Sequence, residues 1–301
     1  MNSLLHIHNA DVYLTGSNSK FLSSDVITQF RGRGDEIHVY PLSFSEYVPA
    51  YQGSVDEAWD DYLIYGGMPL ILTMAEPEDK AAYLNSLFQK VYISDIVERH
   101  DVRNKVELDE LVDILASAIG SYTNQSKLVR TFKSVKGKTI SDKTIKNYID
   151  YLIDSFLISK AVRYDIKGKK YIGSPSKYYF EDVGLRNARL GFRQVEQTHL
   201  MENIIYNELR IRGYHVDVGV VEYYGVNGEG KRGKKQLEVD FVATKGSEKH
   251  YIQSAFTLPT ADKVDQEQRS LLHIPDSFRK IIVVGAVSYT HLRAHETLAN
   301  L

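Results

Sequence analysis

The order of apolar runs in the last hundred residues constrains the fold of this chain most strongly. Helical and strand-like patterns alternate there as a helix over 199–212, strands over 215–223, 236–244 and 249–256, a helix over 261–274 and a strand over 280–284. Strands interleaved with amphipathic helices favour a mixed sheet covered by helices. We therefore predict a small α/β domain over residues 181–286.

Length and composition place the remainder of the chain among globular proteins. The 301 residues are 43% hydrophobic, which suits about two domains with buried cores. The 37 basic and 39 acidic residues nearly cancel, so a nucleic-acid partner has to be met by a local patch. The absence of cysteine excludes disulfides and thiolate metal sites. No apolar run reaches the ~20 residues of a bilayer span, so we expect a cytoplasmic protein without membrane contact.

The first segment, residues 1–102, carries the pattern of part of an α/β domain followed by helices. A strand-like run ends in the small polar turn 15–19, a helical stretch covers 22–30, and a second strand is predicted over 36–40. Apolar residues then recur at helical spacing over 45–65 and 80–97. The first run is typical of an inner strand whose preceding strands are absent.

The second segment, residues 103–180, predicts three helices and a hairpin. Apolar residues line one face of each helix, and Ser141 precedes the third helix as an N-cap. Strands over 157–164 and 177–180 flank a turn at 167–169. This order is that of a winged helix-turn-helix.

A local excess of positive charge coincides with that segment. Such a surface suits phosphate contacts, because neutralised phosphates release counterions. A solvated lysine-rich face and a protein-docking module remain the alternatives. The candidate nucleic-acid-binding residues are Lys127, Arg130, Lys133, Lys136, Lys138, Lys143, Lys146, Lys169 and Lys170.

Three polar residues of the last segment stand where a metal-dependent nuclease would need them. Asp240 lies in an apolar strand, Gln253 in the next strand, and Glu202 in the preceding helix. Hard oxygen ligands of this kind bind divalent cations, so Asp240 is the candidate metal ligand and all three are candidate catalytic residues. In nucleases of the PD-(D/E)XK type a lysine follows the second strand ligand by two positions, and here that position is Ala255. A restriction-endonuclease-like domain without chemistry is the alternative.

The sequence contains no phosphate-binding loop. The pattern Gly-x-x-x-x-Gly-Lys-Ser/Thr is absent, and Gly137-Lys138-Thr139 only imitates its end. No apolar strand ends in Asp-Glu, so a carboxylate for magnesium and water is missing too. We therefore expect no measurable ATP hydrolysis by this chain.

Several strings, in order, nevertheless resemble a prokaryotic AAA-type ATPase with a C-terminal domain of unknown function related to the PD-(D/E)XK fold. They are 11–19, 31–33, 37–47 and 65–69, followed by 95–99, 163–170, 177–187 and 202–206. The resemblance implies a multidomain α/β protein made of a partial AAA-type P-loop domain, a winged helix and a small nuclease-like domain.

The resemblance also implies roles for residues near the start of the chain. Ser17 and Asn18 would form a sensor-like loop that reaches the γ-phosphate or the attacking water, and Arg33, with Arg31 as the alternative, would be an arginine finger. Family members carry the phosphate loop before these residues, so the chain is similar to an N-terminally truncated copy. ATP and Mg²⁺ would be bound by the full-length parent, with none bound by this chain, and self-association through the AAA-type interface is possible.

The last residues, 287–301, resemble a translated sequencing adapter, and we leave them out of the fold prediction. Three hypotheses follow. The chain is part of a cytoplasmic AAA-type ATPase with a DNA-contacting winged helix, a non-enzymatic nucleic-acid-binding or protein-docking module, or a metal-dependent nuclease. We also expect poor solubility if core strands are missing.

Overall fold

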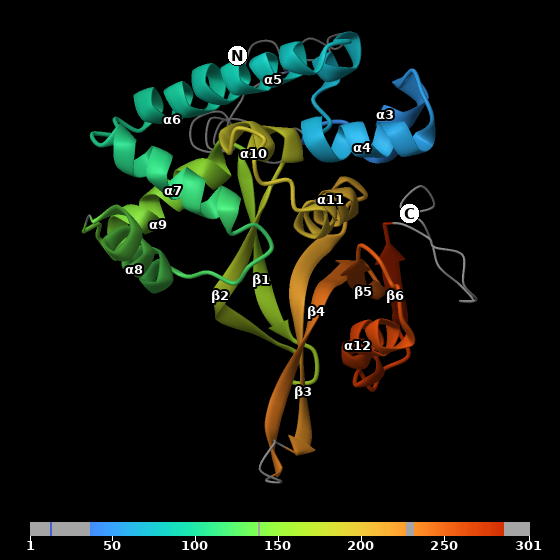
Figure 1. Ribbon diagram of the computed structural model, residues 1–301. Helices are drawn as coiled ribbons and strands as arrows, with labels where there is room; N and C mark the ends of the chain where they lie inside the picture. Colours follow the sequence, from blue (N-terminus) through green and yellow to red (C-terminus); the bar gives the residue numbers. More distant parts are fainter. Residues whose placement is uncertain (1–12, 14–36, 138, 227–231, 286–301) are drawn as a thin grey trace, which may run out of the picture.

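A computed structural model describes residues 13, 37–137, 139–226 and 232–285 (Figure 1). Helices dominate the part before residue 155. They are α3 Phe44–Tyr47, η3 Val48–Ala50, α4 Val55–Tyr65, η4 Pro69–Thr73, α5 Pro77–Leu87, the π-helical turn η5 Phe88–Ile93, α6 Ser94–Arg99, α7 Lys105–Ser117, α8 Gln125–Lys136 and α9 Asp142–Asp154. Within the described residues, no helix has the length and apolar character needed to cross a membrane.

A six-stranded mixed sheet forms the second half of the described chain, in the order β2-β1-β3-β4-β5-β6. The strands β1 and β2 are antiparallel, β3 and β4 are antiparallel, β4 and β5 are antiparallel, and the pairs β1–β3 and β5–β6 are parallel. Their bounds, with the helices between them, are β1 Ile158–Asp165, β2 Lys170–Phe180, α10 Val183–Arg189, α11 Gln197–Ile211, β3 His215–Val226, β4 Arg232–Lys245, β5 Glu248–Ala255, α12 Ala261–Leu272 and β6 Arg279–Val284.

Two helices cover opposite faces of this sheet. Met201 and Ile205 of α11 pack with Phe241 and Ile252, whereas Leu271 of α12 belongs to a separate apolar cluster with Val242 and Tyr251. Neighbouring residues of a strand point to opposite faces, which explains the division between adjacent positions on β4 and β5. The α/β domain predicted over 181–286 therefore has the expected elements in the expected order.

The hairpin β1–β2 forms where the sequence predicts it, but it is not a separate wing. Residues 163–165 of β1 pair in parallel with residues 218–220 of β3, and Ile166 N–H donates to the carbonyl of Val220 at 3.0 Å. This pairing joins residues more than 50 positions apart, which local patterns do not reveal. The hairpin thus belongs to the large sheet, and the predicted boundary at 180/181 lies inside one continuously packed unit.

The predicted boundary at 102/103 is also crossed by packing. One apolar cluster contains Leu84 and Ile93 from the first segment and Leu111, Ile145 and Phe180 from the second. The predicted strand over 36–40 is wrong for its described part, since residues 37–40 are not in a strand and Val39 is 86% exposed. Its alternating pattern has no paired neighbour among the described residues.

The loop 65–69, which we call the YGG loop, is locked against α10 and the segment before α3. The Gly67 carbonyl accepts a hydrogen bond from Leu42 N–H at 2.8 Å, and Gly67 N–H donates to Asp182 at 2.7 Å. Asp182 is also the N-cap of α10, where it accepts from Leu185 N–H at 2.9 Å. The carboxylate therefore joins two segments 115 residues apart.

Glycine is required at the contacts of the YGG loop. A Cβ on Gly67 would lie 2.2 Å from the Leu42 carbonyl oxygen, and one on Gly184 would lie 1.9 Å from the Tyr65 carbonyl oxygen. Both neighbours are backbone atoms, which cannot rotate away as a side chain can. Asn187 strengthens the same contact, because its amide donates to the carbonyls of residues 63 and 64, both at 2.9 Å. We refer to these contacts together as the interlock.

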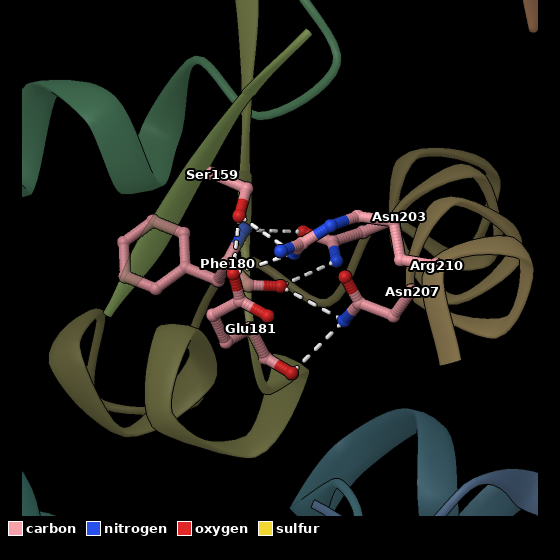
Figure 2. A network of polar contacts seen from close by, with 6 residues as sticks. All are labelled: Ser159, Phe180, Glu181, Asn203, Asn207 and Arg210. Atoms are coloured by element: carbon pink, nitrogen blue, oxygen red, sulfur yellow. Dashed lines mark hydrogen bonds and ion pairs between the residues drawn. The ribbon is translucent and has the colours of Figure 1, made fainter. Parts of the chain in front are cut away.

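A second buried network fixes the end of β2 to α11 (Figure 2). Asn203 accepts from Phe180 N–H at 2.8 Å and donates to its carbonyl at 2.7 Å, as a neighbouring strand would. Arg210 donates to Glu181 at 2.5 Å and to Ser159 at 2.6 Å. The strings 177–187 and 202–206 thus meet in space, and their polar residues satisfy buried backbone and charge.

Candidate functional site

Four charged side chains gather where α11 crosses the sheet. They are Lys177 of β2, Glu202 of α11, and Glu238 and Asp240 of β4, which we call the carboxylate–lysine cluster. Lys177, Glu202 and Asp240 are buried, at 3%, 8% and 8% exposure, and Glu238 lies nearer the surface. Buried charges are stable only when they are paired and hydrogen-bonded, so the contacts within the cluster decide what it can do.

The ammonium group of Lys177 bridges two carboxylates of this cluster. Its Nζ lies 2.8 Å from Glu202 Oε1 and 2.5 Å from Glu238 Oε1. The Tyr179 hydroxyl donates to the same Glu202 oxygen at 2.6 Å. The carboxylates Glu202, Glu238 and Asp240 raise the pKa of Lys177 above its usual range, although burial acts in the opposite direction as the largest single influence. The lysine is therefore held as a cation.

Asp240 reaches the cluster through an irregularity in β4. The pairing of β3 with β4 shifts register between Asp217/Val242 and Gly219/Val239, so two residues of β4 oppose one of β3. A bulge of this kind re-aims side chains. Burial, followed by the charge of Glu202, raises the pKa of Asp240 well above its usual range.

The Asp240 side chain also continues the hydrogen bonding between β4 and β5. The regular ladder starts at Phe241 and Ile252, and beyond it Asp240 Oδ2 accepts from Ser254 N–H at 2.7 Å. In return, Gln253 Oε1 accepts from Asp240 N–H at 3.4 Å. Gln253 therefore lies beside Asp240 as the sequence predicts, but the contacts of both residues hold two strands together.

The loop between α7 and α8 covers the cluster. A Cβ on Gly120, whose φ is +71°, would lie 3.1 Å from Glu202 Oε2, and the ring of Tyr122 lies 5.5 Å from Lys177 Nζ. A side chain at position 120 would press on Glu202, and φ in this range favours glycine. The cluster thus joins the helical part to the sheet.

The cluster does not fit a divalent metal ion. An ammonium group already stands between Glu202 and Glu238, and a carboxylate is replaced by the neutral Gln253. Across the part of the chain that the structure describes, no group of three or more His, Asp or Glu side chains could hold a metal ion. Hard cations need several oxygen ligands that are not shared with another cation.

The sequence pattern did not predict Lys177, which supplies a lysine to the site from β2 and not from β5, the strand of Gln253. Position 255 is alanine, but Lys177 of β2 contacts the carboxylates of Glu202 and Glu238. Lys177 and Tyr179 stand two residues apart and both contact Glu202. Period-two spacing of polar atoms in an aromatic strand is the signal that could have found them.

The predicted nucleic-acid residues fall on two separate places. Lys127, Arg130, Lys133, Lys143 and Lys146 are exposed on α8 and α9. The two helices lie next to each other (Figure 1). Lys136 also belongs to α8, and Lys138 lies outside the described residues.

Lys169 and Lys170 lie at the β1–β2 turn, which is held against β3. Lys167 of this turn donates to the carbonyl of Glu222 at 2.8 Å. Because β1 starts near the end of α9 and runs away from it, the structure does not bring the turn and the helices together as one wing and recognition helix. Ser17, Asn18, Arg31 and Arg33 lie outside the described residues, so their roles remain predictions.

Family models match two stretches of the chain. One described as "AAA domain" covers residues 2–48, and one described as "Domain of unknown function (DUF8612)" covers residues 56–196. The second stretch runs from α4 past α10 and so contains the YGG loop together with Asp182 and Asn187. The interlock therefore lies within the second matched stretch, and its hydrogen bond from Leu42 N–H reaches the end of the first.

Two curated relatives are longer than the part that matches. An uncharacterized protein of Haemophilus influenzae is 36% identical over 290 residues, which are 95% of this chain and 68% of the relative. The uncharacterized protein MJ1544 of Methanocaldococcus jannaschii is 29% identical over 265 residues, which are 84% of this chain and 57% of that protein.

Among solved structures, protein VC1899 from Vibrio cholerae aligns over 85% of this chain and 55% of its own, with 13% identity and a TM-score of 0.21, a likeness too low to support an argument. The match to the Haemophilus protein is much stronger in sequence identity and spans nearly the whole chain and two thirds of the relative. By that likeness the chain belongs to the family of the uncharacterized Haemophilus influenzae protein, and it carries a AAA-domain match followed by a domain of unknown function.

Proposed function

We propose that this chain works as part of a AAA-type ATP-hydrolysing protein. The observation that carries the proposal is the AAA-domain match over residues 2–48, together with the way its last residues are anchored. Leu42 is bonded to the YGG loop, and Phe44 N–H donates to the buried carboxylate of Glu208 on α11 at 2.6 Å. A nucleotide-dependent movement at the matched stretch would thus reach the YGG loop and α11, and α11 packs on the sheet.

The experiment that tests this proposal is an ATP hydrolysis assay of the full-length Haemophilus influenzae relative beside this chain. We expect steady-state turnover in the relative, and none in this chain, since its 301 residues lack the phosphate-loop pattern. Backbone N–H groups of that loop hold the phosphates, so hydrolysis without it has no structural basis.

We further propose that the exposed basic face of α8 and α9 contacts the phosphate backbone of DNA. Lys127, Arg130, Lys133, Lys143 and Lys146 support this, because all five are exposed on two neighbouring helices. The helices themselves are held by apolar contacts of Leu128, Phe132 and Ile145, so charge can be changed without touching the core.

Reversing two of these charges is expected to weaken DNA binding at least tenfold at low salt. The double variant Arg130→Glu/Lys133→Glu removes two phosphate contacts, which lowers the slope of log K against log salt by about 2. The measurement is fluorescence anisotropy with duplex DNA over a salt series. The matched control is Lys169→Glu/Lys170→Glu on the β1–β2 turn, for which we expect less than a threefold change. Equal affinity of the first variant and the wild type would contradict the proposal.

A further inference from the structure

The carboxylate–lysine cluster has the composition of a cation-binding site. Glu202 of α11 and Glu238 of β4 meet at Lys177, the nearby Asp240 of β4 is affected by the charges of all three, and Glu202 and Asp240 are buried. Several carboxylates close together in a buried place need a cation, because desolvation and mutual repulsion both disfavour their charged forms.

Lys177 already makes the contacts that such a cation would make. Its Nζ lies within 2.8 Å of one oxygen on each of Glu202 and Glu238, and the side chain is 4% exposed. Glu202 Oε1 accepts from Tyr179 as well, so this oxygen has two donors. Tyr122 covers the ammonium group from the helical side.

The remaining carboxylate is committed to the backbone. Asp240 Oδ2 accepts from Ser254 N–H at 2.7 Å where the ladder between β4 and β5 ends. Gln253, on the next strand, is neutral and its Oε1 faces Asp240 N–H and the Ser270 hydroxyl. A divalent ion would have to displace an ammonium group and break a strand contact.

We propose that Lys177 is the resident cation of this cluster and stands in the place that a divalent metal ion would take. The site therefore needs no metal for its structure, and its ionic contacts join β2 to α11 and to β4. Removing the ammonium group leaves Glu202 and Glu238 without their shared cation, and we expect Mn²⁺ to bind in its place through these two carboxylates. The proposal does not depend on the AAA-type function.

The test is a titration of the intact 301-residue chain, freed of metal with EDTA, with Mn²⁺ by calorimetry. For the wild type we expect no saturable Mn²⁺ site in this cluster, so wild type and Asp240→Asn should give the same titration. The melting temperature of the wild type should differ by less than about 1 °C between EDTA and Mn²⁺. For Lys177→Ala we expect one saturable Mn²⁺ site. Its melting temperature rises by about 3 °C at ten times Kd. The double variant Lys177→Ala/Glu202→Gln loses that site.

Two results would overturn the proposal. One is a saturable Mn²⁺ site in the wild type that disappears in Asp240→Asn. The other is a folded Lys177→Ala that gains no Mn²⁺ site. Should Lys177→Ala not fold, Lys177→Gln keeps the length of the side chain without its charge and replaces it in the titration. The wild-type titration needs no variant at position 177, so it supports or overturns the proposal by itself.

Discussion

Replacing Gly184 by alanine is expected to lower the free energy of unfolding by at least about 3 kcal/mol, the upper end of the usual cost of overpacking. The new Cβ would lie 1.9 Å from the carbonyl oxygen of Tyr65 and 2.3 Å from its carbon. Both are backbone atoms of the YGG loop, so relief requires α10 to move away. That movement would break the hydrogen bonds of Asp182 and Asn187 to residues 63–67.

Urea unfolding followed by circular dichroism measures this effect as a lower midpoint at an unchanged slope. Gly173→Ala is the matched control, because nothing lies within 4 Å of its Cβ position and the residue is exposed. For this control we expect a change within about 0.5 kcal/mol. A Gly184→Ala variant as stable as Gly173→Ala would show that α10 does not pack on the YGG loop as described.

The pH dependence of stability is the second large effect, and it comes from Asp182. Burial raises the pKa of this carboxyl to about 6, while N–H groups of Leu185, Gly67 and Gly184 partly oppose the change. Between about pH 4 and pH 6 the folded state keeps the proton that the unfolded state has lost. The wild type therefore loses about 3 kcal/mol of stability as the pH rises through that window.

The Asp182→Asn variant has no carboxyl to titrate, so it isolates this contribution. We expect the stability difference between wild type and Asp182→Asn to shrink by about 3 kcal/mol from pH 4 to pH 7. Denaturant unfolding at several pH values measures it. Glu57→Gln serves as the comparison with opposite sign, since hydrogen bonds from Ser54 lower the pKa of Glu57. A difference for Asp182→Asn that grows with pH would contradict the buried placement of this carboxyl.

The elements of the second half could be predicted because their signals are local. The helix α11 spans 197–211 against the predicted 199–212, and β6 spans 279–284 against 280–284. Apolar periodicity, N-caps and turn residues lie within a few positions of the element they define. The Ser141 N-cap of α9 is confirmed in the same way, with its side chain accepting from Thr144 N–H.

What could not be predicted depends on distant pairing. The hairpin β1–β2 has the sequence of a wing, and only its pairing with β3 makes it part of the sheet. The same limit hid Lys177, because the contacts to Glu202 and Glu238 span 25 and 61 positions of sequence. The strings 65–69 and 177–187 carry only a family resemblance in the sequence, and their role in joining loop and helix depends on backbone distances in the fold.

Phosphate release by the full-length Haemophilus influenzae relative decides whether this chain is part of a AAA-type ATP-hydrolysing protein, as we propose. The assay runs with ATP and Mg²⁺, with and without DNA, beside this chain at equal molar concentration. We predict steady-state turnover by the relative and a rate equal to the buffer control for this chain. If the folded relative neither binds nor hydrolyses ATP, or if this chain turns ATP over equally fast, the proposed function is wrong.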